Sequence, residues 1–309
     1  VITFLLALIL SLPYVLIGLY KSISLRGYFY LSFIASLFVI AEYLKSILYG
    51  GFPWLLIGQS QNGTTFDSLY PIMGSYAVSY FVILVSLFFY KAFIDRNKMF
   101  LSLSFVLLAF YFINPINHKN GNFSDSERIS YTLYQPNIYP QQSYDSSQYS
   151  QIMSKYKNIL NMHKNSDLVI FPETIIPIPF TKENELFKSF QTTTNDSNML
   201  ITGLFSKNDE KFFNSMIFFS DEINIYNKRK LVPFGEYTPW YNSLLQLSEN
   251  LNIPLSNLSS GIEKIEKISF GNINIIPMIC FESTFPNLVE SSSSHEVIVN
   301  ISNDAWFGR

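Results

Sequence analysis

Four long apolar stretches dominate the first third of the chain and constrain its fold more than any other feature. They cover residues 1–20, 28–49, 72–90 and 99–116. Each is close to the ~20 residues that a helix needs to cross the hydrocarbon core of a bilayer. A buried globular helix or a signal peptide would account for one such stretch, but not for four joined by short loops. The pattern therefore predicts a multi-pass α-helical membrane region of about four spans over residues 1–116.

The charges of the connecting loops predict the orientation of these helices. Lys21 and Arg26 follow the first stretch, and Lys91, Arg96 and Lys98 follow the third, whereas the loop between the second and third has neither lysine nor arginine. Loops rich in lysine and arginine stay in the cytoplasm. The second-to-third loop and everything after residue 116 are therefore expected outside the cytoplasm.

The composition becomes polar from about His118, and residues 117–309 alternate short apolar runs with helical stretches. Strands that alternate with helices predict an α/β layered domain, and the apolar runs show the lack of alternation expected of strands covered on both faces. Strands are expected within 129–138, 166–174, 198–206, 211–220, 223–234, 267–280 and 296–304, with a hairpin near residues 206–211 and helices at 147–164 and 182–192.

Several classes of function are disfavoured by the composition. The formal net charge of −2 and the pI of about 6.0 provide no basic face for nucleic acid. The chain has one cysteine, which rules out an internal disulfide, and three scattered histidines, which form no metal-ligand cluster and call for no cofactor. A Ser-His-Asp site is also disfavoured, because no Gly-x-Ser-x-Gly motif is present.

Three reactive side chains follow apolar strands: Glu173 in "DLVIFPET", Lys228 in "INIYNKRK" and Cys280 in "INIIPMICFE". Catalytic groups of α/β sheets collect at the carboxyl ends of strands. A thiol with a pKa near 8.5 needs a base or a cation to react at neutral pH. A glutamate can take and return the thiol proton, and a lysine can stabilise the thiolate and a tetrahedral oxyanion. A small buried cysteine with two unrelated charged residues is the alternative interpretation.

The motifs "FPET", "YNKRKLVPFGEY", "CFES" and "NDAWFG" resemble the Glu-Lys-Cys signature of the nitrilase (carbon-nitrogen hydrolase) superfamily. Within it, "GFPWLLIGQSQ", "PIMGSYAVSYF" and "YQPNI" resemble segments of the bacterial apolipoprotein N-acyltransferases. This resemblance implies an αββα nitrilase-like sandwich set on transmembrane helices, in a bacterial inner membrane with the catalytic domain on the periplasmic side. It also implies transfer of an acyl chain from a phospholipid to the N-terminal amine of a diacylglyceryl-cysteine lipoprotein, by a protein expected to be a monomer.

The resemblance implies a role for each matching residue. Glu173 would be the general base and acid, Lys228 would stabilise the oxyanion, and Cys280 would form a thioester acyl-enzyme. Glu236 and Glu282 would orient the lysine and the thiol. Three aromatic residues would line the lipid entrance: Trp306, Phe281 and Tyr144. The last two depart from the family pattern, which often has tyrosine and tryptophan at these positions.

Two further expectations come from the same resemblance. The family has additional transmembrane helices before residue 1, and the rest of the sheet and a closing helix after "WFG", so the sequence is interpreted as a fragment that folds poorly alone. Two alternative functions are a membrane-tethered nitrilase-type amidase, which would use water in place of the amine, and a non-catalytic membrane protein that binds a partner.

Overall fold

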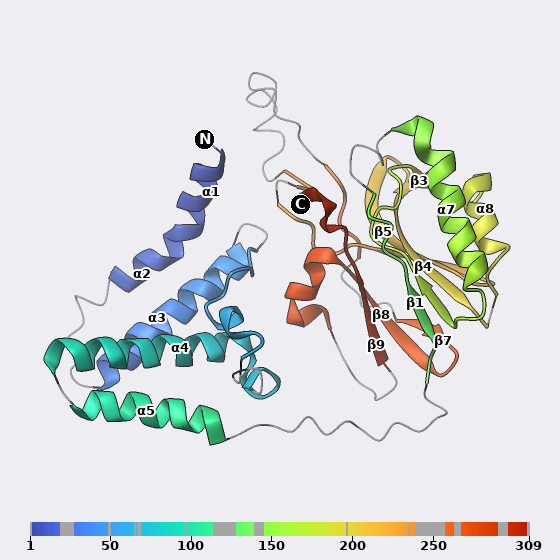
Figure 1. The fold of residues 1–309 in the computed structure, drawn as a ribbon. Coiled ribbons are helices and arrows are strands. Elements are labelled where there is room, and N and C mark those ends of the chain that lie inside the picture. The colour runs from blue at the N-terminus through green and yellow to red at the C-terminus, as the bar shows by residue number, and fades with distance from the viewer. Residues whose placement is uncertain are drawn as a thin grey trace. The chain divides into compact units, whose positions relative to one another are not determined.

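The computed structural model describes two compact units, Val1–Gly121 and Asn122–Arg309 (Figure 1). The described residues are 2–18, 28–48, 51–64, 66, 69–96, 98–113, 128–138, 145–195, 197–233, 235–238, 257–262, 267–289 and 296–307. The predicted boundary at residue 116 and the polar linker after it fall within residues 114–127, outside this set.

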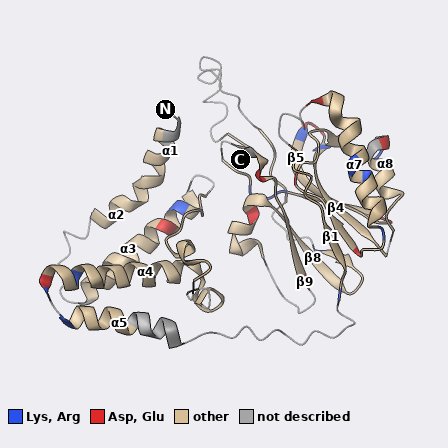
Figure 2. Cartoon of the chain, viewed as in Figure 1, with Lys and Arg blue, Asp and Glu red and all other residues tan. Residues whose placement is uncertain are grey.

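The first unit is helical, and the described residues of each predicted apolar stretch form helix. The first stretch is interrupted at Pro13, which has no backbone N–H to continue an α-helical ladder. Two helical segments, Phe29–Ile47 and Tyr70–Asp95, are long and apolar enough to cross a membrane, and Ala7–Gly18 is a shorter apolar segment. Figure 2 shows long uncharged stretches on these helices. The elements are α1 (Ile2–Ser11), η1 (Leu12–Tyr14), α2 (Val15–Gly18), α3 (Tyr28–Ile47), η4 (Gly58–Gln61), α4 (Tyr70–Asp95) and α5 (Lys98–Ile113).

Buried polar side chains of α3 and α4 hold the loop that joins these helices. Glu42 accepts a hydrogen bond from the Ile57 backbone N–H at 2.6 Å, and Lys45 Nζ donates to the Trp54 carbonyl at 2.8 Å. The Gly58 N–H donates to Ser79 Oγ at 2.7 Å. A Cβ at residue 58 would lie 2.3 Å from a backbone oxygen of α4, so this close approach requires glycine.

The second unit contains two mixed sheets. The six-stranded sheet has the order β1-β2-β4-β5-β6, with β3 pairing with β4, and the three-stranded sheet has the order β7-β8-β9. The predicted hairpin is confirmed as β4 and β5, which pair antiparallel through Asn208 and Lys211. The strands are β1 (Tyr131–Leu133), β2 (Leu168–Ile170), β3 (Pro179–Phe180), β4 (Met199–Asn208), β5 (Lys211–Phe219), β6 (Ile223–Asn227), β7 (Ile268–Phe270), β8 (Ile273–Ile279) and β9 (Glu296–Ile301).

The two sheets pack face to face, with helices against the outer face of the larger sheet (Figure 1). One core joins buried side chains of both sheets, among them Ile201, Met216 and Ile279. The other core joins the six-stranded sheet to α7 (Tyr149–Met162) and α8 (Glu185–Gln191), with Tyr156 and Phe190 fully buried. The part of the chain that the structure describes thus supplies three layers of the expected αββα sandwich, namely one helical layer and two sheets.

Candidate active site

The structure brings together the three reactive side chains that the sequence placed after separate strands. Lys228 directly follows β6 and Cys280 directly follows β8, while Glu173 lies three residues beyond the end of β2. Lys228 Nζ is 3.6 Å from Glu173 Oε1. Both charges also act on the Cys280 thiol, the carboxylate raising its pKa and the ammonium lowering it. The site therefore lies where strands of both sheets end.

The backbone of β4 fixes the position of Glu173. The Gly203 N–H donates to the Pro172 carbonyl at 3.0 Å, and the Gly203 carbonyl accepts from the Ile175 N–H at 3.0 Å. A Cβ on Gly203 would lie 2.4 Å from Glu173 Cα and 2.6 Å from Thr174 N. Glycine is thus required at residue 203 because the carboxylate-bearing segment crosses directly over it.

Asn214 links the carboxylates of Glu173 and Glu236, and it was not predicted from the sequence as a site residue. Its Nδ2 donates to Glu173 Oε1 at 2.7 Å and to Glu236 Oε1 at 2.6 Å. Glu236 Oε1 also accepts from Lys228 Nζ at 2.8 Å, and the other oxygen accepts from the Val232 N–H at 2.8 Å. A signal was present in the sequence, because Asn214 is a polar residue inside the apolar strand "FFNSMIFF" and such a buried amide needs partners.

Glu282 joins the turn that carries Cys280 to the turn that carries Lys228. Its fully buried carboxylate accepts from the Ile279 N–H at 2.9 Å, the Arg229 N–H at 2.7 Å and the Lys230 N–H at 3.1 Å. The Tyr226 hydroxyl lies 2.9 and 3.0 Å from its two oxygens. The contacts are to the backbone beside the thiol, so Glu282 positions the strand end that holds the cysteine.

The backbone at Cys280 lies in the left-handed region, with φ of 52°. Thr174, next to Glu173, has φ of 48°. For residues other than glycine this conformation costs on the order of 1–3 kcal/mol and persists only where surrounding contacts impose it. Such outliers cluster at functional sites, and here one is Cys280 itself and the other is adjacent to Glu173 in the sequence.

The surroundings of the Cys280 thiol raise its pKa and so favour the protonated form. Burial and then the Glu173 carboxylate raise the pKa of Cys280, against the opposing effects of Ser302 and Lys228. Burial likewise raises the pKa of Glu173, although Lys228 and Asn214 oppose it. Burial lowers the pKa of Lys228, but Glu236 and Glu173 outweigh it and the net shift is upward. The lysine is therefore a permanent cation between two acids.

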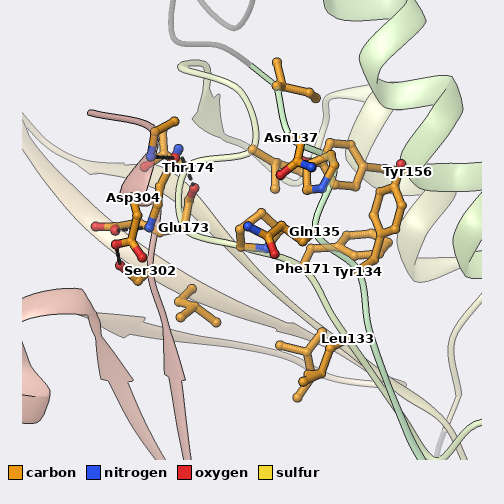
Figure 3. Close-up of a pocket in the computed structure, with 18 of the residues that line it drawn as sticks. Leu133, Tyr134, Gln135, Asn137, Tyr156, Phe171, Glu173, Thr174, Ser302 and Asp304 are labelled. Carbon is orange, nitrogen blue, oxygen red and sulfur yellow. Dashed lines mark hydrogen bonds between the residues drawn. The ribbon is translucent and has the colours of Figure 1, made fainter. Parts of the chain in front are cut away.

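A cavity of about 800 Å³ opens beside Glu173 (Figure 3). One wall is aromatic, with Tyr134, Tyr156 and Phe171, and the opposite wall is the segment after β9 that includes Ser302 and Asp304. An apolar wall faced by a few polar groups is typical of a small-molecule site. Glu173 is thus accessible to a bound molecule in spite of its burial.

The three aromatic residues expected at the lipid entrance have different positions. Phe281 is only 2% exposed and packs edge-on against Phe285, with 4.8 Å between ring centroids, which is an interior position. Trp306 belongs to the 3₁₀-helix Asp304–Phe307, but its side chain lies outside the described part of the structure. Tyr144 lies outside the described residues.

The chain is similar to several curated proteins that are all named apolipoprotein N-acyltransferase. It is 30% identical to the apolipoprotein N-acyltransferase of Wigglesworthia glossinidia brevipalpis over 291 residues, which is 88% of this chain and 56% of that protein. The apolipoprotein N-acyltransferase of Rickettsia prowazekii is also 30% identical over 291 residues, with 88% and 57% covered. The chain thus spans little more than half the length of the curated relatives that it matches.

Two family models match the chain. The model described as the apolipoprotein N-acyltransferase N-terminal domain matches residues 1–88. Among solved structures, XC1258 from Xanthomonas campestris, a CN-hydrolase superfamily protein, matches with a TM-score of 0.37 and 18% identity, over 50% of this chain and 59% of that one. The carbon-nitrogen hydrolase model matches residues 132–309, more than half of the sequence, and the chain belongs to that family.

Proposed function

We propose that the protein is a phospholipid:apolipoprotein N-acyltransferase that acts through a thioester on Cys280. The observation that carries the proposal is the combination of two features in one chain. Residues 1–88 match the N-terminal domain of apolipoprotein N-acyltransferases. In the second unit, Glu173, Lys228 and Cys280 converge at the ends of strands, with 3.6 Å between the first two. The amidase alternative is less supported, because it does not account for the match over residues 1–88.

In the first half-reaction, Glu173 takes the Sγ–H proton and the thiolate attacks the ester carbonyl of a phospholipid. The resulting oxyanion is stabilised by the Lys228 ammonium. The ester C–O bond then breaks, and Glu173 returns its proton to the leaving alkoxide, which departs as a lysophospholipid. The product is an acyl thioester on Cys280.

In the second half-reaction, the N-terminal amine of a diacylglyceryl-cysteine lipoprotein attacks the thioester carbonyl. Glu173 takes a proton from the amine, the thiolate leaves, and the carboxyl group returns the proton to sulfur. The raised pKa of Glu173 suits this role, since a carboxyl that both accepts and donates protons works best when its pKa approaches the operating pH. Glu236 holds Lys228, and Glu282 holds the turn at Cys280.

The proposal also includes the membrane arrangement. Residues 1–116 would form about four spans in a bacterial inner membrane, with the catalytic unit over 117–309 on the outer side. Two described segments are long and apolar enough to cross, Phe29–Ile47 and Tyr70–Asp95, and they support a membrane location for this region. A membrane enzyme of this kind receives its lipid substrates directly from the bilayer. We propose that it works as a monomer without a cofactor.

The test is to incubate the full-length protein in detergent with a phospholipid and to follow the Cys280 peptide by mass spectrometry. We expect an acyl adduct that persists until a diacylglyceryl-cysteine peptide with a free amine is added, and that then appears on the peptide as an amide. A matched acceptor with an acetylated amine should leave the adduct in place. Rapid loss of the adduct to water alone would favour the amidase, and absence of any adduct would refute both.

A further inference from the structure

The end of β9 and the segment that follows it contact both Glu173 and Cys280, yet the proposed mechanism leaves their side chains unused. The Asn303 N–H donates to Glu173 Oε2 at 3.1 Å, and Asn303 Nδ2 donates to the Glu173 carbonyl at 3.3 Å. On the other side, Asn300 Nδ2 donates to the Cys280 carbonyl at 3.4 Å. Ser302 lies between these two contacts in the sequence, and it also lines the cavity (Figure 3).

Strand register places Ser302 beside the cysteine. Strands β8 and β9 are parallel neighbours whose last pair is Ile279 with Ile301. Cys280 and Ser302 are the next residues along these two strands, and the Ser302 hydroxyl lies close enough to the thiol to lower the pKa of Cys280. Ser302 Oγ also donates to Asp304 Oδ1 at 2.8 Å. Figure 3 shows Ser302 and Asp304 together on this wall of the cavity.

A serine hydroxyl has only one proton to donate. Donation to Asp304 leaves the Ser302 oxygen able only to accept from a neutral thiol, which is a weak donor. Once the thiol ionises, the sulfur becomes a charged acceptor, and hydrogen bonds to charged groups are roughly twice as strong as neutral ones. The two acceptors, the Asp304 carboxylate and the Cys280 thiolate, therefore compete for the same proton.

We infer that Ser302 stabilises the Cys280 thiolate by turning its hydroxyl from Asp304 to Sγ when the cysteine ionises. This inference rests on the proposed role of Cys280 as the nucleophile. It adds a donor to two other groups that oppose the negative charge of Glu173 at the sulfur, the Lys228 ammonium and the Phe281 N–H. Asp304 competes with the sulfur, because its carboxylate accepts the Ser302 hydroxyl proton until the thiolate forms.

The test follows the alkylation of Cys280 by iodoacetamide as a function of pH in the full-length protein, with the Cys280 peptide quantified by mass spectrometry. In this reaction the thiolate forms the S–C bond and iodide leaves, so the rate reports the fraction of thiolate. Ser302→Ala should move the midpoint upward by about one pH unit, which is a roughly tenfold lower rate below the midpoint. Ser302→Thr, which keeps the hydroxyl, should restore most of the shift.

Two further variants separate the inference from general effects of mutation. Ser283→Ala is the matched control, because the Ser283 hydroxyl donates to the Cys280 carbonyl at 3.0 Å and should leave the midpoint unchanged. Asp304→Asn should lower the midpoint of the Cys280 alkylation profile more when Ser302 is present than in the Ser302→Ala background. Only with Ser302 present does the variant remove a carboxylate that competes for the Ser302 proton.

If Asp304→Asn shifts the alkylation midpoint equally in the two backgrounds, Asp304 and the thiolate do not compete for the Ser302 proton. If the pH profile of Ser302→Ala overlaps that of the unmodified protein, Ser302 is not a donor to the thiolate. Because Asp304 is exposed, Asp304→Asn is expected to fold even if Ser302→Ala does not, and a midpoint that this single variant leaves unchanged would then overturn the competition. No lipid is present in the assay. Failure of the inference is thus distinguishable from failure of the proposed acyl transfer, which the acyl-adduct experiment tests separately.

Discussion

Gly203→Ala is the sharpest test of how the fold positions the proposed base. The added methyl carbon would lie 2.4 Å from Glu173 Cα, 2.6 Å from Thr174 N and 2.9 Å from Glu173 C. All three are backbone atoms, so no side chain can rotate out of the way. Ordinary contact begins near 3.4 Å. The segment that carries Glu173 must therefore move by about 1 Å, or β4 must move by the same amount.

A displacement of about 1 Å at a catalytic group can cost on the order of 10²-fold in rate, which corresponds to about 2.7 kcal/mol of activation free energy. The assay is the single-turnover rate at which phospholipid acylates Cys280. We expect this rate to fall by about two orders of magnitude, while iodoacetamide still alkylates the thiol, because the atoms nearest the added methyl group belong to Glu173 and Thr174.

The control is the neighbouring residue on the same strand. Thr202 is fully buried, and its hydroxyl has no hydrogen-bond partner among the described residues. Adjacent residues of a strand face opposite sides of the sheet, so Thr202→Val leaves Glu173 in place. It should have no effect on the rate and stabilise the protein by up to about 1 kcal/mol. A Gly203→Ala rate within about threefold of the unmodified protein would refute the argument that close backbone approach positions Glu173.

Three further predictions concern the carboxylates. Burial raises the pKa of Glu173 above its ordinary 4.5, so the rate of acylation should fall through a midpoint above that value as the pH is lowered, as a pH–rate profile would measure. Asn214→Asp places a third carboxylate beside two others, and the fold should lose roughly 3 kcal/mol at neutral pH. Melting curves should show this loss disappearing as acid protonates the group, whose folded pKa must be raised. Glu282→Gln turns an acceptor of backbone N–H groups into a partial donor, and chemical denaturation should show a loss of about 3 kcal/mol.

The alternation of apolar runs and helical stretches was sufficient to predict most strands of the second unit. The continuous apolar run ending at Ile279 became β8, which is buried as expected, and "SKNDEK" became the β4–β5 turn. The two-residue strand β3 was missed, because Pro179–Phe180 is too short to show any period and proline is rare in strands. Its pairing with β4 depends on tertiary contacts alone.

Some features of the candidate site could likewise be predicted from the sequence, and others could not. Glu173, Lys228 and Cys280 could be proposed from sequence because each is a reactive residue at the end of an apolar run. The interior position of Phe281 could not be predicted, because no neighbouring residue in the sequence indicates that its ring packs against Phe285. The partners of Asn214 also needed the structure, because its amide reaches a carboxylate 41 residues away in the sequence.

Glu173 and Glu282 show why residue type alone does not assign a role within this site. Both follow an apolar strand and both are buried, but Glu282 accepts hydrogen bonds from three backbone N–H groups and a tyrosine hydroxyl. These donors occupy both oxygens of Glu282 and tie it to the backbone on either side of the site. Glu173 has one amide donor, one backbone donor and an ammonium 3.6 Å away, and it borders the cavity. Its raised pKa and its access to a bound molecule fit proton transfer, whereas Glu282 fits the positioning of strand ends. The number and kind of hydrogen-bond donors around each carboxylate therefore distinguish a proton-transfer role from a positioning role, although both residues are glutamates in the sequence.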